Sequence, residues 1–133
     1  MGKPSKLQKA LLNSADMPSP GMPVPPRRHA FTIPRSFKLF GRTMKVRYDP
    51  ALIHYDNVKG QARMRDGEIR LQSDSAGTPQ SRTQVEQTFC HELVHCILNV
   101  LAEKDLCADE PFVERFGCAL HQALTTSEGD LDK

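Results

Sequence analysis

Residues 83–101 read TQVEQTFCHELVHCILNVL, and this stretch decides what kind of domain the chain can form. Its apolar side chains recur every three or four residues, which is the spacing of an amphipathic helix. Thr83 and Glu86 match a capping box, in which the two side chains satisfy free amides at a helix N-terminus. The pattern predicts a helix from Thr83 to about Ala102, with an apolar stripe formed by Val85, Phe89, Leu93, Ile97, Val100 and Leu101.

The middle of this helix carries His91-Glu92-Leu93-Val94-His95, the pattern H-E-x-x-H. Residues four apart project from one helix face, so both imidazoles can reach a single metal ion. Neutral imidazole is a good ligand for Zn²⁺, and the carboxylate of Glu92 can act as a general base toward an attacking water. Two alternatives to a catalytic metal site remain. One is an amphipathic helix with two surface histidines, and the other is a metal site without catalysis.

A second helix is predicted to begin at Asp109 or Glu110. Pro111 falls in its first turn, where the missing amide costs nothing. The apolar positions of this helix are Phe112, Val113, Phe116, Leu120 and Leu124.

This second helix can supply the third protein ligand that a catalytic zinc needs. We choose Glu114, because the nearby Gly117 and Cys118 are small and would let the two helices approach closely. Glu110 lies one turn earlier on the same face and is the main rival. His121 is an alternative ligand, a hydrogen-bond donor to a ligand, or a stabiliser of a tetrahedral intermediate.

Upstream of both helices, two segments alternate apolar and polar residues as half-buried strands do. Residues 37–48 form one predicted strand pair, with a turn at Gly41-Arg42. Residues 61–72 form a hairpin around Asp66-Gly67, a dipeptide suited to a two-residue type I′ turn. Folding about this turn sets Met64 opposite Ile69 and Ala62 opposite Leu71. The fold class is therefore α+β, with a small antiparallel or mixed sheet packed against the H-E-x-x-H helix and a C-terminal helix.

Composition describes one small domain with an uneven charge. The 133 residues carry 18 Lys+Arg and 16 Asp+Glu, a net charge of +2. Residues 27–70 hold eleven basic and four acidic residues, whereas residues 71–133 hold four basic and eleven acidic ones. Such asymmetry is a hint of a polyanionic partner, and a weak nucleic-acid contact through residues 27–70 is one expectation. Mutual attraction of the two halves in the fold is the other.

The chain is expected to have three parts. Residues 1–30 are rich in proline and predict a flexible arm with a short helix. Residues 31–125 form the folded domain, and residues 126–133 a frayed tail. The sequence shows neither a secretory signal nor an apolar run long enough for a membrane span. Four cysteines without Cys-x-x-Cys spacing favour a reduced, cytoplasmic protein, with Cys90 and Cys96 as small core residues.

His91-Glu92-Leu93-Val94-His95 followed by Glu110-Pro111-Phe112-Val113-Glu114-Arg115-Phe116-Gly117 resembles the small zincin metallopeptidases. The nearest groups are the ImmA/IrrE-like domains and compact phage- and prophage-encoded metallopeptidases. The SprT-like group is more distant because its third ligand is a histidine. The resemblance implies a gluzincin-type site with His91, His95 and Glu114 as ligands and Glu92 as the base. It also implies that an edge strand, expected at Glu68–Gln72, binds an extended peptide substrate.

The expected function is that of a zinc-dependent, monomeric metallopeptidase in the cytoplasm of a bacterium or a phage-infected host cell. A metal-activated water would hydrolyse a peptide bond, with Glu92 as general base. The alternative is a non-enzymatic phage or prophage interaction module with a structural or vestigial zinc site. Such a module would bind a host protein or nucleic acid through its basic N-terminal half.

Overall fold

The structure is a computed structural model that describes residues 31–54, 58–75 and 78–132. The predicted arm, residues 1–30, lies outside the described residues. One compact unit of the chain extends from Phe31 to Ser127, and it contains all the elements described below. Among the described residues, none of the helices combines the length and the apolar character that a bilayer span requires.

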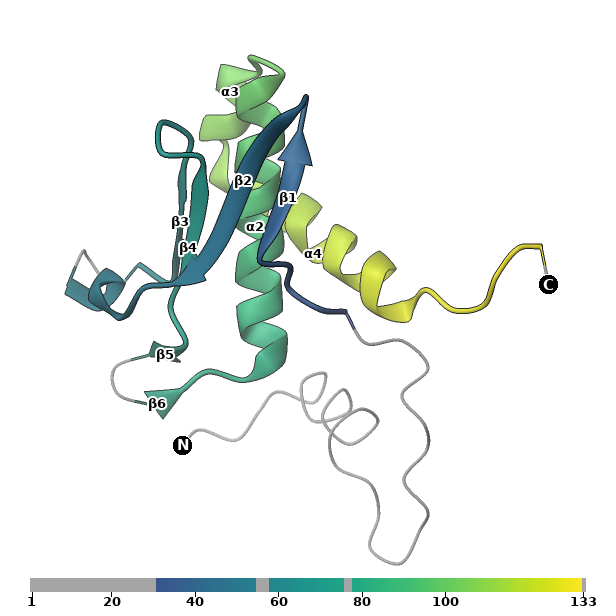
Figure 1. Cartoon of the computed structure of the whole chain (residues 1–133), viewed down its shortest axis with the longest axis horizontal. Coiled ribbons are helices and arrows are strands. Elements are labelled where there is room, and N and C mark those ends of the chain that lie inside the picture. Colours follow the sequence, from purple (N-terminus) through teal and green to yellow (C-terminus); the bar gives the residue numbers. More distant parts are fainter. Residues whose placement is uncertain (1–30, 55–57, 76–77, 133) are drawn as a thin grey trace, which may run out of the picture. The chain divides into compact units, whose positions relative to one another are not determined.

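The unit contains a four-stranded mixed sheet in the order β1-β2-β4-β3 (Figure 1). Its strands are β1 (Ser36–Leu39), β2 (Arg42–Tyr48), β3 (Gly60–Arg63) and β4 (Glu68–Leu71). The β1–β2 and β3–β4 pairs are antiparallel, and β2 and β4 run parallel in the centre. The predicted α+β class with a mixed sheet is confirmed. The short elements η1 (Pro50–His54), β5 (Asp74–Ser75) and β6 (Thr78–Pro79) lie in the connections.

Three helices follow the sheet in the chain: α2 (Arg82–Val100), α3 (Lys104–Ala108) and α4 (Glu110–Thr126). The two long helices match the predicted segments. The short helix α3 was not predicted, since five residues carry too little periodicity to be recognised. Asp109 caps α4 by accepting a hydrogen bond from the backbone N–H of Phe112.

The capping box of α2 lies two residues earlier than predicted. Ser81 accepts a hydrogen bond from the backbone N–H of Gln84, whose side chain accepts one from the Ser81 N–H in return. The predicted capping box of Thr83 and Glu86 is wrong, because the Glu86 carboxylate contacts Arg82 and His121 instead.

The first strand pair turns one residue earlier than predicted. Leu39 pairs with Arg42, so the turn consists of Phe40 and Gly41. Both have positive φ, 49° and 80°, which is the requirement of a type I′ turn. The type I′ geometry predicted for Asp66-Gly67 is therefore found here instead.

The second hairpin has a different register from the predicted one. Ala62 pairs with Ile69 and Gly60 with Leu71, which leaves a four-residue connection, residues 64–67. Only Gly67 in this connection has a positive φ, of 67°, so the two-residue type I′ turn does not form. The shift is two residues, and the side chains keep their faces because the period of a strand is two.

The strand expected at the sheet edge lies in the interior. β4 is hydrogen-bonded to β2 on one side and to β3 on the other, so Glu68–Gln72 offers no free edge to a peptide. The parallel β2–β4 pair explains the difference, because a hairpin prediction considers only neighbours in sequence. The edge strands of the four-stranded sheet are β1 and β3.

Helix α2 lies between the sheet and α4, with apolar clusters on both sides. One cluster joins the inner face of the sheet to α2 through Met44, Ile69, Leu71, Val85, Phe89, Cys90 and Cys96. The other joins α2 to α4 through Val94, Leu98 and Val113. Burial on two sides fixes the rotation of α2 and decides which of its residues face outward.

Gly117 sets the distance between α2 and α4. A Cβ atom at Gly117 would lie 3.1 Å from both the Cα and the backbone N of His91. These are backbone atoms of a buried helix, which cannot move aside as a flexible side chain could. The expectation that a small residue permits a close helix approach is confirmed at this position.

We expect Gly117→Val to lower the free energy of unfolding by about 2 kcal/mol, as overpacking of a buried contact does. Chemical denaturation would measure the change. Ala119→Val is the matched control, because it places the same side chain at an exposed position of α4. Equal effects of the two variants would contradict a steric role for Gly117.

Candidate metal centre

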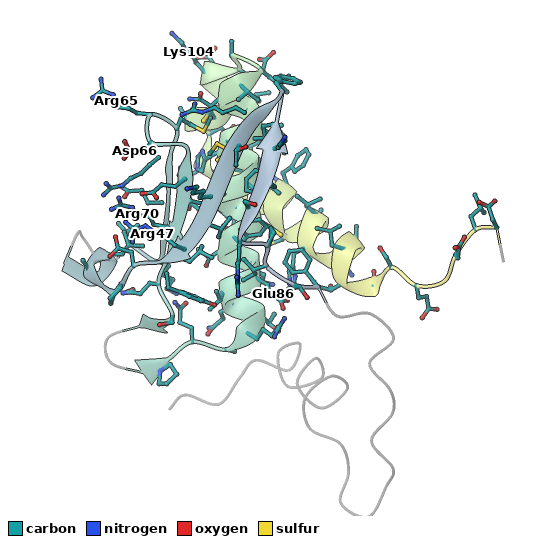
Figure 2. All side chains as sticks on the ribbon, in the orientation of Figure 1. Arg47, Arg65, Asp66, Arg70, Glu86 and Lys104 are labelled. Atoms are coloured by element: carbon teal, nitrogen blue, oxygen red, sulfur yellow. The ribbon has the colours of Figure 1, made fainter. Side chains whose placement is uncertain are left out.

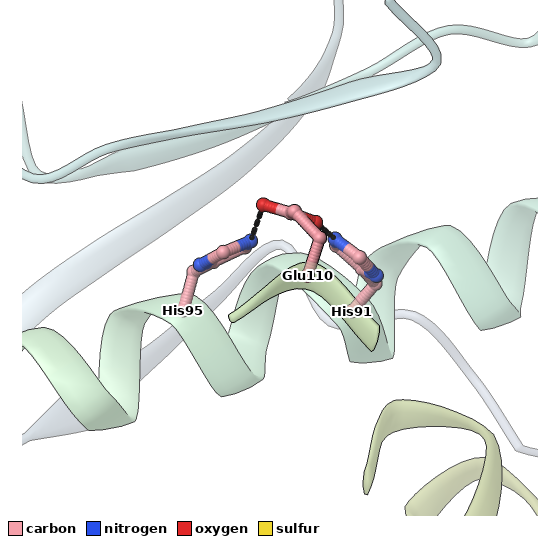
Figure 3. Close-up of side chains that lie close together, drawn as sticks. All are labelled: His91, His95 and Glu110. Carbon is pink, nitrogen blue, oxygen red and sulfur yellow. Dashed lines mark ion pairs between the residues drawn. The ribbon is translucent and has the colours of Figure 1, made fainter. Parts of the chain in front are cut away.

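Two histidines on α2 and one glutamate at the start of α4 converge on a common point. Nε2 of His91 lies 3.0 Å from Oε2 of Glu110, and Nε2 of His95 lies 3.0 Å from its Oε1 (Figure 3). The three ligand atoms lie within 4.8 Å of one another. The spacing of four residues on α2 places both rings on one face, and the N-terminus of α4 brings the carboxylate above them.

The chemistry of this donor set suits a metal ion. Two imidazole nitrogens and a carboxylate oxygen are common ligands of divalent transition metals. Metal–ligand bonds of about 2.0–2.1 Å at tetrahedral angles separate the ligand atoms by about 3.3 Å. Each Nε2 lies 3.0 Å from one oxygen of the carboxylate, and the three ligand atoms lie within 4.8 Å of one another. Binding of an ion would therefore require the side chains to move until one oxygen and both nitrogens reach this spacing.

The other ring nitrogens of the histidines have partners of their own. Nδ1 of His91 lies 2.7 Å from Oε2 of Glu114 and donates to that carboxylate. Nδ1 of His95 lies 3.4 Å from Sγ of Cys107, whose thiol donates to the His95 carbonyl. A neutral imidazole that donates from Nδ1 has its lone pair on Nε2. With Nδ1 engaged in this way, Nε2 is the nitrogen that each ring would offer to a cation.

The arrangement differs from the predicted ligand set in one residue. Glu114 was expected as the third ligand, but its carboxylate lies at Nδ1 of His91, on the side opposite the converging atoms. Glu110, the predicted rival, is the glutamate that joins His91 and His95 in the group that could hold a metal ion. The two glutamates lie one turn apart on the same face of α4. The position of α4 along α2 therefore decides which of them meets the Nε2 atoms of His91 and His95. The short helix α3 and the Gly117 contact determine that placement.

Glu92 lies beside the group and is buried, with 8% of its surface exposed. Burial raises the pKa of Glu92 to about 7; Glu110 and Glu114 also raise it, whereas His91 and a hydrogen bond from the Ala62 backbone lower it. A carboxyl group in this position is shielded from bulk water but close to the converging ligand atoms.

A cavity of about 450 Å³ opens above these side chains. Its floor includes His91, Glu92 and His95, and one wall is the edge strand β3, residues 60–62. Sequence reasoning did not assign this strand, nor Met64, Asn99 and Cys107, to the site. Asn99 could have been found, because it follows His95 by four residues on the same helix face. Nothing in the sequence signals Cys107, which depends on the path of α3.

His121 does not belong to this group. Its Nε2 lies 2.9 Å from Oε1 of Glu86, and both residues are buried. The second carboxylate oxygen, Oε2, accepts a hydrogen bond of 2.8 Å from Nε of Arg82. His121, the alternative ligand, is instead engaged in a buried contact between α2 and α4.

We expect His121→Ala to lower the free energy of unfolding by about 3 kcal/mol, because it leaves a buried carboxylate without one of its partners. Gln122→Ala, at the exposed neighbouring position, should change it by less than about 0.5 kcal/mol. Chemical denaturation of both variants measures the difference. A loss of metal affinity without a loss of stability would instead place His121 at the metal centre.

The cysteines beside the histidines are core residues, as predicted. Cys90 and Cys96 are fully buried, and burial raises the pKa of each thiol to about 12. Cys118 is exposed on α4. We expect a thiol reagent at pH 8 to label Cys118 in the folded protein and to reach Cys90 and Cys96 only after unfolding. Mass spectrometry of labelled peptides would detect the order, and early labelling of Cys90 would contradict it.

Comparison of the chain with protein-family models, with curated proteins and with solved structures found no match. The interpretation of the site consequently depends on its own residues and geometry.

Proposed function

We propose that this protein is a zinc-dependent metallopeptidase of the zincin type. The observation that supports the proposal is the convergence of two imidazole nitrogens and the Glu110 carboxylate next to a buried glutamate. In the H-E-x-x-H pattern, the same helix supplies both histidines and the acid–base residue. Here His91, His95 and Glu92 have this arrangement on α2.

Zinc is the ion that this ligand set favours, with His91, His95 and Glu110 as its three protein ligands. Bound there, Zn²⁺ would polarise the scissile carbonyl and lower the pKa of a water molecule. Glu114 and Cys107 would hold the two rings in place through Nδ1. Three protein ligands leave one position of a tetrahedron open, as catalytic sites require.

Glu92 is the residue that moves the proton. Its carboxylate accepts the proton of the attacking water and then delivers it to the amine nitrogen that leaves. Burial between α2 and β3 restricts its rotamers, so the acceptor oxygen stays close to the reacting atoms. No other carboxyl group among the described residues both lies in the cavity and stays off the ligand position.

The edge strand β3 fits an extended peptide. Among the described residues β3 pairs with β4 only, so its other edge has backbone groups available for hydrogen bonding. Addition of a peptide strand to a sheet edge is a common mode of recognition. A peptide paired with β3 would pass over the cavity that contains His91 and Glu92.

The proposal is tested by measuring metal content and peptide cleavage on the full chain. Elemental analysis should find about one zinc per chain, and His91→Ala should lose it. Cleavage of a denatured protein mixture, followed by mass spectrometry of new termini, should stop on chelation and return with added Zn²⁺. A wild-type protein without metal affinity would refute the proposal. Zinc binding without cleavage of any substrate would favour the non-enzymatic module with a structural zinc.

A further inference from the structure

The outer face of the sheet, opposite α2, is a second feature with a chemical character of its own. Met44, Ile69 and Ala62 point inward to the core, so the residues that alternate with them point outward. Of the three α-helices, α2 packs on the sheet, on its inner face. Figure 2 shows Arg47 and Arg70 on the side of the sheet away from α2.

This outer face is basic on all four strands. It carries five cationic side chains, one acidic side chain and three neutral polar ones. The cations are Lys38 on β1, Lys45 and Arg47 on β2, Arg70 on β4 and Arg63 on β3; the acid is Glu68; the neutral residues are Ser36, Thr43 and Gln61. None of the nine is aromatic. We refer to these residues as the basic sheet face.

Carboxylates hold the arginines of this face in position. Arg70 donates to Glu68 at 2.5 Å and to Asp49 at 3.1 Å, and Arg47 donates to Glu68 at 3.3 Å. A guanidinium group has five N–H donors, so each arginine keeps donors that these contacts do not use. Fixed guanidinium groups lose less entropy on binding an anion than free ones do.

The lysines of the face are available to an external anion. Among the described residues neither Lys38 nor Lys45 has an ion pair, and both side chains are exposed. Lys38 is opposite Thr43, and Lys45 is opposite Ser36, so these ammonium groups and hydroxyls form one polar area. Ammonium and hydroxyl groups together are suited to phosphate oxygens.

The helical layer of the unit is acidic, in contrast to the basic sheet face. The helices and their connections carry seven acidic residues, Glu86, Glu92, Glu103, Asp105, Asp109, Glu110 and Glu114, but only three basic ones, Arg82, Lys104 and Arg115. A polyanion that approaches the unit is attracted to the sheet and repelled by the helices. The electrostatic field of the unit therefore directs such a partner to the basic sheet face.

We propose that the basic sheet face binds the phosphate backbone of a nucleic acid without sequence preference. Four strands about 4.8 Å apart make a surface about 14 Å wide, on which cations recur along and across the strands. A regular polyanion meets several of them at once. The face has no aromatic side chain for base stacking, so it contacts phosphates rather than bases. The proposed metal ligands His91, His95 and Glu110 lie on α2 and α4 and not on this face.

The test is nucleic-acid binding by the full chain, measured by fluorescence anisotropy with a labelled 20-base-pair duplex and a 20-nucleotide single strand. The variant Lys38→Glu/Lys45→Glu should weaken binding at least about tenfold. The matched control Lys104→Glu/Arg115→Glu changes the net charge equally on the helical side and should weaken it less than about twofold. The logarithm of the binding constant should fall with the logarithm of salt concentration. For three to five phosphate contacts the slope should be about −2.7 to −4.5 on the duplex and about −2.1 to −3.5 on the single strand.

Three outcomes would overturn the inference. Equal losses in the two double variants would show that net charge alone matters. Unchanged binding in Lys38→Glu/Lys45→Glu would assign the contact to another part of the chain. Stronger binding to anionic lipid vesicles than to nucleic acid would assign the face to a membrane surface. None of these outcomes depends on peptidase activity, so the proposed function is tested separately.

Discussion

The Glu92→Gln variant is expected to retain its zinc but to hydrolyse peptides about 10²–10⁴-fold more slowly than the wild type, the usual effect of removing a general base. Glutamine keeps the size of the side chain and removes only the proton acceptor. The proposed metal ligands His91, His95 and Glu110 are untouched. Elemental analysis and initial rates of peptide cleavage, both on the full chain, measure the two parts of this result.

The variant should also fold well, which makes the result interpretable. The folded state raises the pKa of Glu92 from 4.5 to about 7. Metal-free wild type should therefore lose stability as pH rises from about 4.5 to about 7, because the unfolded chain ionises first. Glutamine removes this titration, so metal-free Glu92→Gln should melt at the same temperature as the wild type at pH 8, or higher.

Glu103→Gln is the matched control, since it makes the same chemical change at an exposed site between α2 and α3. It should cleave at the wild-type rate. Full activity of Glu92→Gln with bound zinc would exclude Glu92 as the base. Loss of zinc in Glu92→Gln would assign this glutamate to the ligands.

Local patterns predicted the two long helices, and the placement of the two histidines on one helix face, correctly. The i, i+4 spacing of His91 and His95 is a property of one helix, so no tertiary information is needed to place both rings on one face. Asp109 and Pro111 likewise determine the start of α4 from neighbouring residues. The α+β class follows from the same local patterns.

Features that depend on packing between distant segments were predicted less well. The parallel pairing of β2 with β4 joins strands about twenty residues apart, and it converts the expected edge strand into an interior one. The choice between Glu110 and Glu114 depends on the position of α4 along α2. In the structure Gly117 lies against His91 and His121 against Glu86, which fixes an antiparallel alignment that the sequence does not specify.

A comparison of Glu110→Gln with Glu114→Gln tests this alignment directly. We expect Glu114→Gln to lower zinc affinity about 10–100-fold, the usual cost of losing a partner that orients a ligand. Glu110→Gln should lower it further, because it replaces a charged carboxylate, whose two oxygens each lie 3.0 Å from one imidazole Nε2, with a neutral amide. Competition with a chromogenic zinc chelator measures both affinities at one pH.

The order of the two losses in zinc affinity shows which glutamate is the ligand. Both glutamates are exposed on α4, one turn apart, so differences in folding or net charge cannot separate the variants. Cys107→Ala should behave like Glu114→Gln, since it removes the partner of His95 Nδ1. A larger loss in Glu114→Gln than in Glu110→Gln would restore Glu114 as the ligand. It would also mean that α4 shifts along α2 when the metal binds.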